Sequence, residues 1–148
     1  MAHFAKISEE NKVLTVLSVN NKDVLNSEGV ETESVGQAYL ETHNNWPSHL
    51  WIQCSYNTLL GVHSKGGTPF RANYPSVGWD WDSENEIFWD SEKPYPSWVK
   101  DITKGAWVAP VAEPELTQEQ KDQNEAFTHW WGYVWNEENQ TWDLTNSI

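Results

Sequence analysis

The sequence predicts a mainly β fold, α+β at most, in which a small antiparallel domain is built from hairpins and one or two short helices. Two observations carry this prediction. A segment rich in β-branched residues follows a turn near the N-terminus, and a motif with turn residues between aromatic segments occurs twice in the second half. The 148 residues fit one domain with its own core, so we expect a single domain over 1–148.

The N-terminal part of the chain, residues 1–74, opens with a predicted hairpin. Residues 2–7 form a short apolar run, 8–12 are turn-like, and 13–19 are dense in valine and leucine. Both faces of the 13–19 segment are largely apolar. We therefore expect this strand to lie in the centre of a sheet that is covered on both sides.

Three further segments complete residues 1–74. Residues 33–43 predict a short helix that Gly36 weakens, and residues 51–56 alternate as a strand does. Residues 57–74 are rich in glycine and other turn formers but keep several apolar anchors. We interpret them as a long ordered loop, the kind of segment on which contact surfaces often lie.

The C-terminal part, residues 75–148, contains an internal repeat. Residues 78–88 align with 132–142 in the pattern Gly, aromatic, any, Trp, Asp/Asn, any, Glu, Asn, then an aromatic three positions on. Each copy predicts a hairpin with Asp/Asn-x-Glu-Asn as its turn, and a similar hairpin is expected from 98–101 and 106–108. Together they predict a β-meander, since a solenoid needs more units.

A polar segment interrupts this hairpin series. Residues 116–127 contain the capping-box pattern Thr117-x-x-Gln120, which predicts a short exposed helix. Residues 116–128 therefore look like an insertion between the second and third hairpins.

The charge balance excludes several classes of partner. Nine basic and 22 acidic residues give a net charge of −13, whereas binding nucleic acid or an anionic membrane requires clustered Lys and Arg. The 11 Trp, 5 Tyr and 4 Phe argue against disorder. Both features concentrate in residues 75–148, which hold 15 acidic residues, 4 basic residues and nine of the Trp.

The acidic run Asp80-x-Asp82-x-Glu84-x-Glu86 is the most tempting metal site. Alternate strand residues share a face, so Asp80 and Asp82 offer oxygens to a hard cation. The run departs from an EF-hand loop, with Asn85 in place of the required Gly and Ser91 in place of the final Glu. A solvated strand face opposite buried Trp79 and Trp81 is favoured, and we expect no metal and no cofactor.

Enzymatic signals are weak. The five histidines show no metal-binding spacing, and no phosphate-binding loop or Gly-x-Ser-x-Gly motif is present. Cys54 suits a thiol nucleophile paired with a histidine, but a lone strand cysteine is more often a core residue. A carboxylate pair for glycoside hydrolysis stays open, although no pair stands out. We expect no enzyme and no catalytic residue.

The aromatic residues favour a contact surface. Each Trp on its own is expected in the core, but eleven Trp and five Tyr are too many to bury fully in 148 residues. Exposed aromatic residues are typical of places where proteins meet. The candidate partner contacts are Phe70, Arg71, Tyr74, Trp79 and Trp81.

A resemblance covers nearly the whole chain. The start Met1-Ala-His-Phe-Ala-Lys6, the blocks Gln53-x-Ser55-Tyr56-Asn57-Thr58 and Gly66-Gly67-Thr68-Pro69-Phe70-Arg71-x-Asn73-Tyr74, and the later matches Gly78-x-x-x-Asp82, Lys93-Pro94-x-x-Ser97-Trp98, Trp107-x-Ala109-Pro110-Val111 and Trp135-Asn136-Glu137 occur in order. This series resembles small virion-associated proteins of marine tailed bacteriophages, notably cyanophages. The chain differs from them by the 116–128 insertion and by Trp in place of Tyr.

The resemblance implies a virion structural protein that decorates the capsid or tail in several copies, in contact with major capsid or tail proteins. It would be made in the host cytoplasm, which fits the absence of a secretory signal pattern after Met1. A carbohydrate-binding module of a tail fibre, using Trp stacking, is the alternative. An acidic inhibitor that mimics DNA ranks last, because the carboxylates interleave with Trp.

Overall fold

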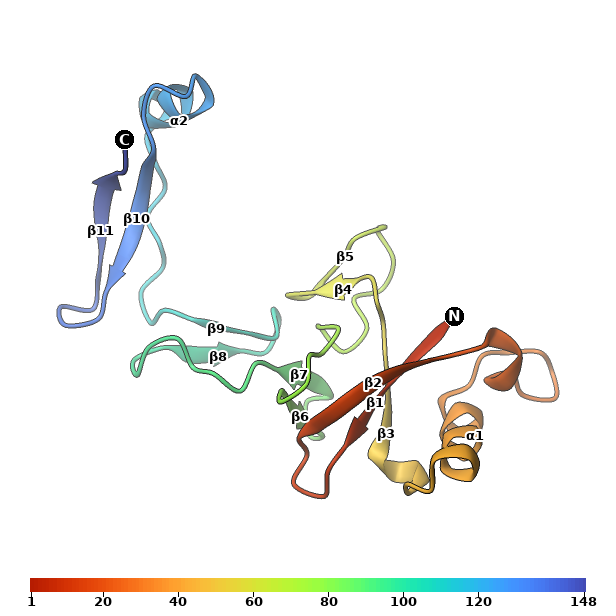
Figure 1. Ribbon diagram of the computed structural model, residues 1–148. Coiled ribbons are helices and arrows are strands. Elements are labelled where there is room, and N and C mark those ends of the chain that lie inside the picture. The colour runs from red at the N-terminus through yellow and green to blue at the C-terminus, as the bar shows by residue number, and fades with distance from the viewer. The chain divides into compact units, whose positions relative to one another are not determined.

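The computed structural model describes residues 1–148 and confirms the predicted fold class, with 32% strand, 18% helix and small antiparallel sheets. Figure 1 shows the elements in chain order. The chain forms two compact units. Unit 1 comprises residues 1–92 and 101–106, and unit 2 comprises residues 93–100 and 107–148. The division at residue 92 differs from the 74/75 division that composition indicates.

A three-stranded antiparallel sheet organises unit 1. Its strands are β1 (Ala2–Ile7), β2 (Val13–Val19) and β3 (Trp51–Cys54), in the spatial order β2-β1-β3. The predicted N-terminal hairpin is confirmed, with Ala2 opposite Val19 and Lys6 opposite Thr15. The prediction that residues 13–19 form the central strand is wrong. The later strand β3 pairs with β1, which places β2 at the edge and leaves Leu14 42% exposed.

Both faces of this sheet are covered. On one face, Ala5, Ile52 and Cys54 pack with Trp81 and Phe88, which come from the hairpin that follows the long loop. The other face packs on helix α1 (Glu33–Asn44), whose prediction is confirmed.

The α1 face of the sheet explains the glycine within that helix. A Cβ at Gly36 would lie 2.4 Å from Cζ of Phe4, so only glycine lets the helix approach the fully buried Phe4 ring. Phe4 and Trp51 are both 0% exposed and pack with Leu40 of α1. The residue that weakens the helix locally therefore allows its close packing.

The loop over 57–74 is ordered and contains two short strands, β4 (Thr58–Leu59) and β5 (Val62–His63). Asn73, which is fully buried, anchors its end. The Asn73 side chain donates to the carbonyls of Phe88 and Gly105 at 2.7 and 2.8 Å and accepts from Leu60 N at 2.8 Å. One polar side chain thus joins three segments of unit 1.

The predicted hairpins are confirmed, but each forms its own two-stranded sheet instead of one continuous meander. They are β6 (Asp80–Asp82) with β7 (Ile87–Trp89), β8 (Val99–Asp101) with β9 (Ala106–Val108), and β10 (Trp131–Asn136) with β11 (Thr141–Asn146).

The three hairpins share one turn. The side chains of Asp82, Asp101 and Asn136 each accept from the main-chain N–H three residues later, at 3.1–3.2 Å. The next residue has a positive φ in each case: 54° at Glu86, 61° at Gly105 and 49° at Gln140. The sequence pattern therefore corresponds to one type of turn, which occurs in all three hairpins.

The remaining helical segments are short. They are the 3₁₀ turns η1 (Asn21–Asp23) and η2 (Ser48–Leu50), and helix α2 (Gln118–Glu125). The predicted capping box is confirmed, since Gln120 N donates to Thr117 Oγ1 at 3.2 Å and Thr117 N to Gln120 Oε1 at 2.9 Å. None of the helices has the length and apolar character needed to cross a membrane.

Candidate contact surfaces

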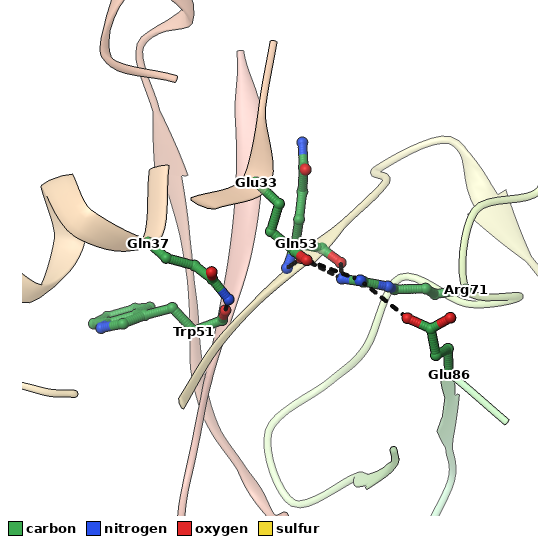
Figure 2. A network of polar contacts seen from close by, with 6 residues as sticks. All are labelled: Glu33, Gln37, Trp51, Gln53, Arg71 and Glu86. Atoms are coloured by element: carbon green, nitrogen blue, oxygen red, sulfur yellow. Dashed lines mark hydrogen bonds and ion pairs between the residues drawn. The ribbon is translucent and has the colours of Figure 1, made fainter. Parts of the chain in front are cut away.

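Arg71 is held inside unit 1 and does not extend into solvent. Its side chain is 10% exposed and donates to both carboxylate oxygens of Glu33 at the start of α1. It also donates to the Gln53 carbonyl at 2.7 Å and lies 3.5 Å from Glu86. Figure 2 shows Glu33, Gln53 and Glu86 converging on the guanidinium. An arginine fork bound by a carboxylate on one side is a strong, directional contact.

This network covers the outer edge of β3. Glu33 Oε2 accepts from Gln53 N at 2.7 Å, Arg71 donates to the Gln53 carbonyl, and Gln37 Nε2 donates to the Trp51 carbonyl at 2.7 Å. Side chains therefore satisfy main-chain groups that would otherwise be free at the sheet edge. An edge covered in this way is protected from pairing with another strand.

The structure separates the five predicted contact residues by environment. Trp81 is 7% exposed and belongs to the core, where its ring lies 4.6 Å from Phe88. The Arg71 guanidinium lies 4.5 Å over Phe70 and 5.2 Å over Trp81, which brings these three residues together. Tyr74 and Trp79 are half-buried against the same core. Partner contact stays a prediction, and only the half-buried rings of Phe70, Tyr74 and Trp79 present part of their surface.

An open groove of about 650 Å³ lies beside the N-terminus in unit 1. Tyr56, which is 69% exposed, borders it together with His3, Phe70 and polar residues that include Gln53, Asn57 and Lys65. His3 stacks on Tyr56 at 5.7 Å and meets Tyr74 edge-on at 5.6 Å. Burial lowers the pKa of His3, and the N-terminal charge lowers it further. The groove is an amphipathic surface lined in part by His3.

Cys54 lines this groove but lacks the character of a nucleophile. It is 4% exposed in the core, and burial raises the pKa of its thiol to about 12. The thiolate is the reactive form, so this cysteine stays protonated and inert near neutral pH. The core interpretation of Cys54 agrees with its position.

The acidic run of the first repeat is occupied by internal contacts. Asp80 forms an ion pair with Lys12 at 2.6 Å. Asp82 accepts from Glu84 N and Asn85 N at 3.1 Å, and from Asn85 Nδ2 at 2.8 Å. Burial raises the pKa of Asp82, but the hydrogen bonds from Asn85 and its neighbours outweigh this and lower the pKa. These carboxylates hold a turn and a strand edge together.

Unit 2 contains a cluster of aromatic rings. Trp98 and Trp142 pack against Trp135, with centroid distances of 6.3 and 5.2 Å, and Tyr95 lies 5.3 Å from Trp98. Glu137 closes the cluster, since its carboxylate accepts from Ser97 Oγ at 2.6 Å and from Trp135 Nε1 at 2.7 Å. The Ser97 and Trp135 hydrogen bonds lower the pKa of Glu137.

The most exposed aromatic pair lies after α2. Phe127 is 75% exposed, Trp130 is 55% exposed, and their centroids are 6.1 Å apart. We call this pair the aromatic tip. Phe127 N donates to the Asn124 carbonyl at 3.0 Å and Thr128 N to the Gln123 carbonyl at 3.1 Å, the two bonds of a Schellman helix end.

Phe127 occupies the position in that helix end where glycine is usual, with φ 57°. A left-handed backbone costs a non-glycine residue roughly 1 kcal/mol. The chain therefore carries backbone strain at the residue whose ring is most exposed. The predicted contact residues do not include Phe127 or Trp130, although the sequence carries a signal for them: a large aromatic residue directly after a polar helix that no glycine ends.

Scans against protein-family models, characterised proteins and solved structures each find no match.

Proposed function

We propose that this chain is an accessory structural protein of a tailed-phage virion that binds capsid or tail proteins without catalysis. The aromatic tip is the observation that supports this proposal best. Two large rings are exposed together. The backbone of one of them, Phe127, is strained, although its ring is not buried in the core. Strain kept at an exposed aromatic residue is typical of a binding site, and aromatic residues dominate protein interfaces.

The surroundings of the aromatic tip define the partner's chemistry. Helix α2, which leads into the tip, carries Glu119, Asp122 and Glu125. Its one basic residue, Lys121, lies 3.8 Å from Glu115. The matching surface on the partner is an apolar pocket with Lys or Arg at its rim. Binding through such charges weakens as salt is added.

Phe127→Gly tests this proposal, because it removes the ring and the strain together. We expect the melting temperature to stay level or rise, while binding to purified particles that lack the protein falls at least tenfold, as measured by co-sedimentation. Tyr56→Ala, which removes an equally prominent ring from unit 1, is the matched control and should bind normally.

Two results would contradict the proposal. One is full binding of the Phe127→Gly, Trp130→Ala double variant to particles. The other is absence of the protein from purified virions, where a fixed copy number is expected by quantitative mass spectrometry.

Glycan binding is a second candidate, supported by the groove beside Tyr56. An exposed aromatic ring next to amide, hydroxyl and charged groups is a suitable surface for sugar stacking. A glycan array should then give signals that Tyr56→Ala abolishes and Phe127→Gly leaves unchanged. Absence of any signal at millimolar sugar would exclude this candidate.

A further inference from the structure

The outer edge of β2 contains main-chain groups that have no partner within the chain. The outward-facing groups of β3 belong to Trp51 and Gln53. Along an antiparallel strand, successive residues direct their main-chain N–H and C=O groups to opposite sides. Ile52 therefore points inward and bonds to Ala5, which lies opposite it on β1. Because Ala5 directs its groups toward β3, Val16, which lies opposite Ala5 on β2, has no bond to β1. The N–H and C=O groups of Val16 and Ser18 therefore point away from β1.

Only the beginning of β2 is covered at this edge. Val13 N donates to the Trp79 carbonyl and Gly78 N to the Val13 carbonyl, both at 2.8 Å. Beyond Val13 no main-chain bond joins this edge to another segment. The open stretch includes Leu14, which is 42% exposed, and Ser18, which is also exposed.

The two edges of this sheet differ in how their main-chain groups are covered. Charged and amide side chains cover the β3 edge. In contrast, β2 has the sequence Val-Leu-Thr-Val-Leu-Ser-Val, with no charge, proline or glycine. Proteins usually protect a free edge with one of these residues or with a covering segment. The unprotected part of β2 after Val13 is a surface on which another strand can pair.

We propose that the free edge of β2 pairs antiparallel with β2 of a second copy of this chain, so that one sheet continues across a two-fold axis. This goes beyond the proposed function, and it does not depend on that function. A two-fold axis brings identical groups to both sides of the contact, and an antiparallel strand pair meets this condition.

The two-fold symmetry of an antiparallel strand pair favours a second copy as the occupant, and charge does not oppose it at this edge. Each chain has a net charge of −13, so most self-contacts would bring carboxylates together. The β2 edge is a stretch where self-pairing places no charge opposite another. The outward-facing residues must face each other across the axis. With Val16 opposite Val16 of the second copy, Leu14 lies opposite Ser18 of the second copy.

Sedimentation velocity on the full chain between about 1 and 200 µM tests this pairing, because contacts of this small area give affinities near the micromolar range. We expect the mass to move from 17.1 kDa toward twice that value, and the dimer to strengthen with salt as the like charges are screened. Hydrogen exchange should show the Val16 and Ser18 amides protected only at high concentration.

Two edge variants give the decisive comparison. Ser18→Pro removes an N–H that the chain does not use internally, and Leu14→Lys adds a charge to the edge. Each should lower the dimerisation constant at least tenfold with an unchanged circular dichroism spectrum. Leu144→Lys on β11, where the exposed fraction is 43%, is the matched control and should dimerise normally.

The proposal is overturned if the chain stays monomeric at 200 µM, or if it dimerises equally well with both edge substitutions. A dimer that Leu144→Lys abolishes and Leu14→Lys does not would also overturn it, since the contact would then lie on the C-terminal hairpin.

Discussion

The first and last hairpins, β6–β7 and β10–β11, have the same local design and different surroundings. Trp81 faces Phe88 across one hairpin, and Trp135 faces Trp142 at the equivalent positions of the other. In the first hairpin all three β7 residues are buried: Phe88 packs with the main sheet of unit 1, and Ile87 and Trp89 pack with Ala72. In the second, Val134 is 54% exposed and Leu144 43% exposed. Turn chemistry thus forms the hairpin, and its packing partner decides how much of each strand is buried: Trp81 and Trp135 are both buried, whereas Trp142 is only half-buried at the position of the fully buried Phe88.

The largest effect on stability is expected when the ring at the equivalent position of each hairpin is removed. Phe88→Ala should lower the free energy of unfolding by about 3–5 kcal/mol, because Phe88 is 0% exposed and its loss leaves a cavity. Trp142→Ala should cost roughly half as much, since the Trp142 ring is only half-buried. Urea denaturation measures both. Equal losses would mean that the two hairpins contribute equally to the core.

The next effect concerns the covered edge of β3. Arg71→Met should cost about 3 kcal/mol, because it leaves the Glu33 carboxylate without its partner in a partly buried position. The Arg71→Met, Glu33→Gln double variant should recover part of this loss. Chemical denaturation of the four-member cycle gives the coupling, and additive losses would rule out the pairing as a source of stability.

A smaller effect is expected from acid. The folded-state pKa of Glu137 is lowered, so its contribution to stability is present above the usual carboxyl pKa and is lost as pH falls through the folded value. Glu137→Gln should therefore flatten the acid side of the unit 2 unfolding curve, monitored by Trp fluorescence. The position equivalent to Glu137 in the first hairpin is Ser83, which does not titrate. If the acid transition of Glu137→Gln is the same as that of the unchanged protein, the hydrogen bonds from Ser97 do not stabilise the charged form of the Glu137 carboxyl.

The smallest effect concerns the shared turn. Gln140 has φ 49° at the position where the middle hairpin has Gly105, and its side chain is exposed. Gln140→Gly should raise the free energy of unfolding by about 0.5–1 kcal/mol through relief of backbone strain. A thermal melt detects the change. Gly105→Ala should destabilise strongly, because the new Cβ would lie 2.6 Å from Cβ of Ala72.

The sequence predicts the features that local chemistry decides. The capping box at Thr117 and the turns at Asp82 and Asn136 each depend on residues within four positions, and these elements form as expected. The order of strands is different, because β1 becomes central only when residues 51–54, far along the chain, pair with it. Alternation alone cannot tell a central strand from an edge strand with a hydrophobic neighbour.

The same limit applies to the contact residues. Arginine is a residue type that is enriched at interfaces. The carboxylate partner of Arg71, however, lies 38 residues earlier and holds the side chain inside the fold. Trp81 is buried by the sheet, whereas Phe127 is exposed at a helix end within the predicted 116–128 insertion. Distant contacts therefore assign aromatic and charged residues of similar appearance to different roles.

The contacts of Asn73 also determine the order of events during synthesis. Unit 1 includes residues 101–106, and the Asn73 amide donates to the Gly105 carbonyl at 2.8 Å. On the ribosome, a chain that has emerged only to residue 92 has already exposed every strand of the main sheet but lacks this acceptor. A buried amide without its partner is unfavourable, so unit 1 completes its packing only after residue 106 has left the exit tunnel.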